Sequence, residues 1–62
     1  MSEIRKIRQA QGMTLAAVSG KVGVSIAYLS DIEKGNRHGS PAVLVRIADA
    51  LGVKVSDLEG AS

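Results

Sequence analysis

The chain has no cysteine, phenylalanine or tryptophan, and its 62 residues include only one tyrosine, one proline and one histidine. Because cysteine is absent, neither a disulfide nor a thiolate metal site can stabilise the fold, which suits a reducing cytosol. Because large aromatic residues are almost absent, the core has to be aliphatic, as suits closely packed short helices. A chain of this length buries only about 60% of its unfolded surface, so we expect a free energy of unfolding of roughly 5 kcal/mol.

Long apolar runs and a secretory signal are absent as well. The longest apolar runs are a few residues long, far short of the ~20 residues that span a bilayer, and no charged segment precedes an apolar one at the N-terminus. We therefore expect a cytoplasmic domain without a membrane partner. The net charge of +2 and the isoelectric point of about 9.4 permit an anionic partner such as nucleic acid without requiring one.

What is present is a helical spacing of apolar residues between regularly placed glycines, which predicts five short helices. The first covers about residues 2–11, with Ser2 as its N-cap and Gly12 after its end. Thr14 can cap the second helix. Gly20 lies inside that second helix and costs it ~1 kcal/mol relative to alanine.

The third and fourth helices have clear boundaries. Ser25 is placed to cap the third, which ends at Gly35. Ser40 followed by Pro41 is a strong start signal for the fourth, because proline is well suited to the first helical position. That helix ends at Gly52.

Ser56 and Glu59 have the spacing of a capping box and predict a short fifth helix. We expect residues 60–62 to be frayed. Residues 1–62 are thus predicted to form one all-α domain, a compact bundle of five helices. Its expected core consists of Ile4, Ile7, Leu15, Val18, Val22, Val24, Leu29, Ile32, Leu44, Ile47, Ala48, Leu51, Val53 and Leu58.

The connection between the second and third helices is the most informative feature. Only Gly23, Val24 and Ser25 join them, too few residues for the helices to run antiparallel, so they must cross steeply. Gly23 allows the sharp bend of the backbone, Val24 enters the core, and the small Ser19 permits the two helices to approach each other closely. This is the pattern of a helix-turn-helix unit, whose second helix can enter a major groove. The pattern alone is a weak signal, because other helical hairpins share it.

The longer stretch "GMTLAAVSGKVGVSIAYLSDIEKGNR", followed by "SPAVLVRIADALGV", resembles the Cro and phage-repressor (XRE-type) family of helix-turn-helix domains, from about Ile4 to Leu58. The resemblance implies a lambda-repressor-like five-helix bundle with residues 25–34 as the recognition helix. It implies an inward ion pair between Arg8 and Glu33. It further implies base-facing roles for Ser25, Ile26, Ala27, Tyr28 and Asp31, and phosphate contacts from Thr14, Leu15, Lys34, Asn36 and Arg37.

The chemistry of these residues supports phosphate binding better than base recognition. Lys34 and Arg37 follow the recognition helix, where positive charge suits the negative helix end and can meet a phosphate; Arg37 could equally be a solvated loop residue. His38 is more simply explained as a loop residue. Thr14 begins a helix whose free N–H groups can bind a phosphate oxygen, or it is a cap and nothing more.

Base recognition has fewer suitable residues. Arg, Lys, Asn and Gln make the usual bidentate contacts to guanine and adenine, and none occurs between Ser25 and Asp31. Ile26 and Ala27 can pack on thymine methyl groups, unless Ile26 is merely an exposed apolar residue. Tyr28 can reach a phosphate or a base edge, or it packs against the second helix. We therefore expect recognition that depends strongly on DNA shape.

The leading hypothesis is a sequence-specific regulator of transcription that binds double-stranded DNA, acting as a homodimer on two half-sites. The candidate dimer surface lies around Val53, Val55 and Leu58, unless these side chains complete the core. The alternative is the same fold used as a protein-interaction module, such as an antitoxin or adaptor, with Ile26 to Tyr28 as its apolar surface.

An enzyme is the poorest explanation of the sequence. The chain has a single histidine, no cysteine, no glycine-rich phosphate loop and no metal-ligand spacing, and a bundle this small has no room for a substrate pocket. We expect no cofactor, no metal and no small-molecule substrate.

Overall fold

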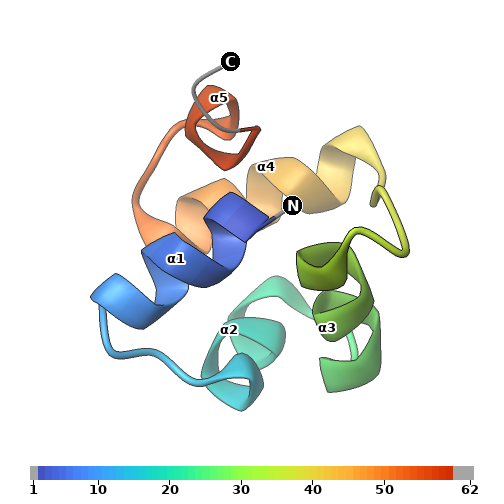
Figure 1. Cartoon of the computed structure of the whole chain (residues 1–62), viewed down its shortest axis with the longest axis horizontal. Coiled ribbons are helices and arrows are strands. Elements are labelled where there is room, and N and C mark those ends of the chain that lie inside the picture. Colours follow the sequence, from blue (N-terminus) through green and yellow to red (C-terminus); the bar gives the residue numbers. More distant parts are fainter. Residues whose placement is uncertain (1, 60–62) are drawn as a thin grey trace.

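The computed structural model describes residues 2–59, and within them the only regular elements are helices (Figure 1). The predicted frayed segment, residues 60–62, lies outside the described residues. The helices are α1 (Ser2–Ala10), α2 (Leu15–Val22), α3 (Ile26–Lys34), α4 (Pro41–Leu51) and α5 (Val55–Leu58). The prediction of five short helices is therefore confirmed, and α1 ends one residue earlier than expected.

The helices pack so that α2 and α3 lie together at one end of the molecule. Helix α5 lies at the other end, where it packs against α1 and α4 (Figure 1). Helix α4 also packs along α2, and α1 bridges to α3. Helices α1 and α4 thus support the α2–α3 end on one side, while its outer side is not covered by another helix of the described residues.

The core is aliphatic, as the composition requires. Its fully buried residues are Ile4, Val18, Val22, Leu29, Ile32, Ile47, Ala48, Leu51 and Leu58. The other five residues of the predicted core are half-buried and pack against this cluster. Met13, Val43 and Ala50 also pack there and were not predicted. The helical spacing of apolar residues therefore identified the inward faces correctly.

Three helices begin at the predicted hydroxyl caps. The side-chain oxygens of Thr14, Ser25 and Ser40 each accept a hydrogen bond from the backbone N–H three residues later, at 3.1, 3.0 and 3.2 Å respectively. Pro41 occupies the start of α4, where its missing N–H is not needed. These caps fix where each helix starts and thus which residues stand at its exposed first turn.

The cap of the last helix was predicted wrongly. Helix α5 begins at Val55, so Ser56 lies inside it and is not a cap. The backbone N–H of Lys54 instead donates to a carboxylate oxygen of Asp57 at 3.0 Å. The earlier start places Val55 and the fully buried Leu58 one turn apart, so that both pack on the core. At the other end of the chain, Ser2 is the first residue of α1, and its side chain lies outside the described part of the structure.

The connections that follow the helices differ in one respect. After α1, α2 and α4, the residue that follows the first glycine is half-buried and apolar: Met13, Val24 and Val53. The corresponding residue after α3 is Asn36, which is exposed. Its backbone N–H donates to the carbonyl of Asp31 at 2.9 Å and closes the helix end. The α3–α4 connection therefore turns polar side chains outward immediately after α3.

Candidate nucleic-acid interface

The turn between α2 and α3 has helix-turn-helix geometry. The two helices are bent by 108° relative to each other, within the 90–120° range (approximately) typical of this unit. Gly23 has a φ of 85°, which favours glycine, and its N–H donates to the carbonyl of Ser19 at 2.8 Å. Ser19 is buried and Val24 is half-buried against the core. The predicted steep crossing is confirmed.

The lengths of the helices can also be compared with the length that crosses a membrane. Among residues 2–59, no single helix is long and apolar enough to cross a membrane. Only α2 and α3 counted together reach the required length and composition, and they are bent at the turn.

Helix α3 has a buried side and an outer side. Leu29, Ile32 and Glu33 are buried. The residues that the family resemblance assigns to the bases lie elsewhere on the helix: Ser25, Ile26 and Ala27 are exposed, and Tyr28 and Asp31 are half-buried. Ile26 is 49% exposed, which is unusual for a large aliphatic side chain in this chain. The first turn of α3 thus presents an apolar pair to the outside.

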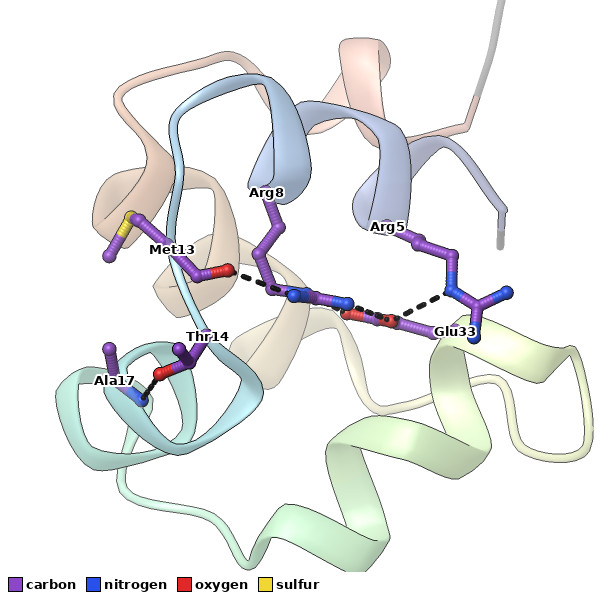
Figure 2. Close-up of polar contacts among 6 residues, drawn as sticks. All are labelled: Arg5, Arg8, Met13, Thr14, Ala17 and Glu33. Carbon is purple, nitrogen blue, oxygen red and sulfur yellow. Dashed lines mark hydrogen bonds and ion pairs between the residues drawn. The ribbon is translucent and has the colours of Figure 1, made fainter.

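A buried ion pair holds α3 against α1. Arg8 donates from Nε to Oε2 of Glu33 at 2.7 Å and from Nη2 to Oε1 at 3.1 Å. The hydrogen bond with Glu33 raises the pKa of Arg8, and this outweighs the opposing effect of burial. Arg5, one turn earlier on α1, places its Nε 3.8 Å from Oε1 of Glu33 (Figure 2). A carboxylate near a helix C-terminus is unfavourable by itself, so the arginines compensate it.

The same arginine reaches the start of α2. Its Nη1 donates to the carbonyl oxygen of Met13 at 2.9 Å, and Met13 directly precedes Thr14, the cap of α2 (Figure 2). Arg8 therefore connects α3 to the N-terminus of α2. Every buried side-chain nitrogen and oxygen in the described residues has a hydrogen-bond partner, so this network is complete.

The predicted phosphate contacts come from two places. Thr14 is exposed and Leu15 is half-buried at the start of α2, where the first N–H groups of a helix have no partner within it. Lys34, Asn36 and Arg37 are all exposed at the end of α3 and in the loop after it. The hydroxyl oxygen of Thr14 is engaged in capping, but its O–H group remains a donor.

One contact links the two predicted sets of residues. The guanidinium carbon of Arg37 lies 4.9 Å from the centroid of the Tyr28 ring, at cation–π distance. The Tyr28 side chain also packs against the core. It therefore has both a packing role and a contact with Arg37. Nothing in the sequence indicated this pairing, because it depends on the path of the α3–α4 loop. Arg5 was missed as well, although its position three residues before Arg8 places both on one helix face.

A shallow, open depression lies between α2 and α4. It is lined by Lys21, Val22, Arg46, Asp49 and Ala50. Lys21 and Arg46 are both exposed.

Comparison with known proteins assigns the family. A family model described as Helix-turn-helix matches residues 4–58. This chain belongs to that family, in its XRE-type form, as the resemblance from about Ile4 to Leu58 implied.

Three relatives illustrate the similarity. The HTH-type transcriptional regulator DdrOP3 of Deinococcus deserti is 36% identical over 55 residues, 89% of this chain and 43% of that protein. The transcriptional regulator ClgR of Mycobacterium tuberculosis is 42% identical over 53 residues, 86% of this chain and 47% of that protein. The immunity repressor protein of Bacillus phage phi105 is 35% identical over 57 residues, 92% of this chain and 40% of that protein. The chain spans less than half the length of these three relatives.

A solved structure has the same fold. The restriction-modification controller protein C.AhdI from Aeromonas hydrophila matches with a TM-score of 0.86 at 25% identity, over 90% of this chain and 85% of that chain. The predicted all-α, lambda-repressor-like bundle is therefore confirmed.

Proposed function

We propose that this chain is a transcription regulator that binds double-stranded DNA by placing the first turn of α3 in the major groove. The observation that carries the proposal is the exposure of Ser25, Ile26 and Ala27 at the start of a helix bent 108° away from α2. In helix-turn-helix proteins the N-terminal residues of the second helix contact base edges. Tyr28 and Asp31 complete the proposed base-facing set.

The phosphate contacts of the proposal flank this turn. The N-terminus of α2, at Thr14 and Leu15, offers unpaired N–H groups. Lys34 and Asn36 offer exposed polar side chains after α3, with Arg37 in the same loop. Arg8 holds both the start of α2 and helix α3 in place, because it donates hydrogen bonds to Glu33 on α3 and to the carbonyl oxygen of Met13, the residue before Thr14.

The proposal includes a homodimer, since one such domain contacts only a few base pairs and two half-sites about one helical turn apart give useful specificity. Leu58 was a candidate for the dimer surface, but it is fully buried within the chain and belongs to the core. The half-buried Val53, which precedes α5, and Val55, its first residue, remain as candidates. We further propose that residues 1–62 act as one domain, in the cytoplasm and without a catalytic role.

One observation favours a second function, binding of a protein by the same surface. Ile26 is 49% exposed next to the exposed Ala27, and such a pair suits a hydrophobic contact with a partner protein, with this chain acting as an antitoxin or adaptor. The two functions differ in their dependence on salt. Binding to phosphates releases counterions and weakens steeply as salt rises, whereas an apolar contact does not.

The test measures binding to a random-sequence duplex at about 50 mM and about 200 mM salt, for the native chain, Lys34→Ala and Arg46→Ala. Arg46→Ala is the matched control, because it removes the same charge from the depression between α2 and α4. We expect the logarithmic salt slope to fall by about 0.9 in Lys34→Ala and to be unchanged in Arg46→Ala. If the native chain does not bind at the lower salt concentration, the DNA proposal is wrong and the protein partner should be sought.

A further inference from the structure

The proposed base-facing positions have no side chain of the kind that distinguishes bases best. Arginine, lysine, asparagine and glutamine are absent between residues 25 and 31. The loop after α3 supplies a side chain of this kind, Arg37. Its guanidinium carbon lies 4.9 Å from the centroid of the Tyr28 ring. Arg37 follows the end of α3, yet its charged group reaches back to the helix's first turn, where Tyr28 stands.

The contact leaves the hydrogen-bonding capacity of Arg37 unused. Within residues 2–59, Arg37 makes no hydrogen bond and no ion pair, and it is exposed. A guanidinium that stacks on an aromatic face keeps its N–H donors in its own plane, where they remain free to bond other acceptors. Those donors form a fork that matches the O6 and N7 acceptors of guanine in the major groove.

Tyr28 is a suitable support for this group. Its backbone N–H donates to Ser25 Oγ at 3.0 Å, and its half-buried ring packs against the core. A ring held in this way restricts the arginine before any ligand binds, so less conformational entropy is lost on binding. The restriction places the guanidinium beside Tyr28, one of the positions proposed to enter the groove.

We propose that Arg37 contacts a guanine base and that Tyr28 is its positioning residue. The family resemblance placed Arg37 among the phosphate contacts; this inference assigns it instead to base recognition. It rests on the proposed DNA-binding function and adds a specific ligand, a guanine at one position of each half-site.

The two roles of Arg37 are separable by the variant Arg37→Lys. A phosphate contact requires positive charge, which lysine retains. A guanine contact is made best by the planar fork held over the ring, which lysine lacks, so lysine retains only a weaker guanine preference. Because Arg37 is exposed in a loop, this substitution leaves the folded core intact, so its result does not depend on a change in stability.

The experiment selects a preferred duplex with the native chain from a random pool and then changes each of its base pairs in turn. We expect one guanine whose replacement weakens native binding by about 10- to 100-fold. In Arg37→Lys, the preference at that position is weakened while the preferences at other positions remain, and Tyr28→Leu weakens the same preference. Tyr28→Phe retains the ring and is expected to retain the preference. Arg46→Ala serves as the charge control.

A second readout tests the contact in the free protein. The δ protons of Arg37 should resonate upfield of their ordinary position, because the guanidinium group next to them lies over the Tyr28 ring, and they should return to that position in Tyr28→Leu. The inference is overturned if Arg37→Lys weakens binding equally at all sequences, or if it keeps every base preference at full strength. Failure of the native chain to bind any duplex would overturn the proposed function as well, so the two failures are distinguishable.

Discussion

Arg8 and Glu33 form a two-pronged ion pair across the core, with nitrogen–oxygen distances of 2.7 and 3.1 Å. Both side chains are almost completely buried, so neither has water as an alternative partner. The third hydrogen bond of Arg8, to the Met13 carbonyl, extends the pair to the loop before α2. One side chain therefore sets the relative positions of α1, the start of α2 and α3, which include the surfaces proposed to meet DNA.

Removal of the Glu33 carboxylate should be strongly destabilising. In Glu33→Ala the Arg8 guanidinium stays buried without its partner, and the loss of such a partner costs about 3–5 kcal/mol. This is comparable to the whole stability expected for a chain of this size, roughly 5 kcal/mol. Urea unfolding followed by circular dichroism measures the loss. Arg5→Ala is the control: its side chain is 56% exposed, so its pair with Glu33 contributes about 1 kcal/mol or less. Equal losses in the two variants would contradict this account.

The pair should be insensitive to pH in the neutral and mildly alkaline range. Bonding to Glu33 raises the pKa of Arg8, and a raised pKa stabilises the fold fully below the unfolded-state pKa. That stabilisation is lost only as pH rises through the folded-state pKa, and arginine remains protonated up to about pH 12. The double variant Arg8→Met with Glu33→Gln removes both charges. We expect the difference in unfolding free energy between native chain and double variant to be the same at about pH 7 and about pH 9; a difference that changes would show another titrating partner.

Gly39 should tolerate alanine less well than Gly12 does. Both have a positive φ, 73° and 69°, which alanine adopts at a cost of about 1–2 kcal/mol. A Cβ at Gly39 would also lie 3.1 Å from Cδ1 of the fully buried Ile32, whereas nothing lies within 4 Å at Gly12. We expect Gly39→Ala to lose about 1 kcal/mol more than Gly12→Ala, measured by thermal unfolding of both variants. If the two substitutions cost the same, the core beside Ile32 is looser than the structure indicates.

Gln11 should stabilise the end of α4. Its Nε2 donates to the carbonyl oxygen of Leu51 at 2.6 Å, one of the last carbonyls of that helix, which lack a partner within it. Gln11→Ala is expected to lower the free energy of unfolding by about 1 kcal/mol. Gln9→Ala makes the same change on the neighbouring exposed surface of α1 and should cost less. Faster amide exchange at the end of α4 in Gln11→Ala only would support the assignment.

The helices and the core were predictable because their signals are local. The hydroxyl caps Thr14, Ser25 and Ser40 and the apolar spacing between them follow from properties of neighbouring residues. The same approach was wrong at α5, since four residues are too few for a periodic pattern and the acceptor Asp57 lies within the helix itself.

The candidate site was less predictable from local signals. Arg8 and Glu33 are 25 positions apart, and helical spacing indicates only that such residues face inward; their pairing was implied by the family resemblance. The contact of Tyr28 with Arg37 depends on how the α3–α4 loop folds back, which no local pattern specifies. The roles of individual residues at DNA remain predictions.

The division of α3 into two sides has a consequence for how such a protein can diverge. Leu29, Ile32 and Glu33 hold the helix from within, while the exposed Ile26 and Ala27 belong to a different set of positions. Substitutions at the outer positions leave the packing of the inner ones unchanged. After a gene duplication, one copy could therefore acquire a new target through a few substitutions on the surface, while both copies kept the same fold and core.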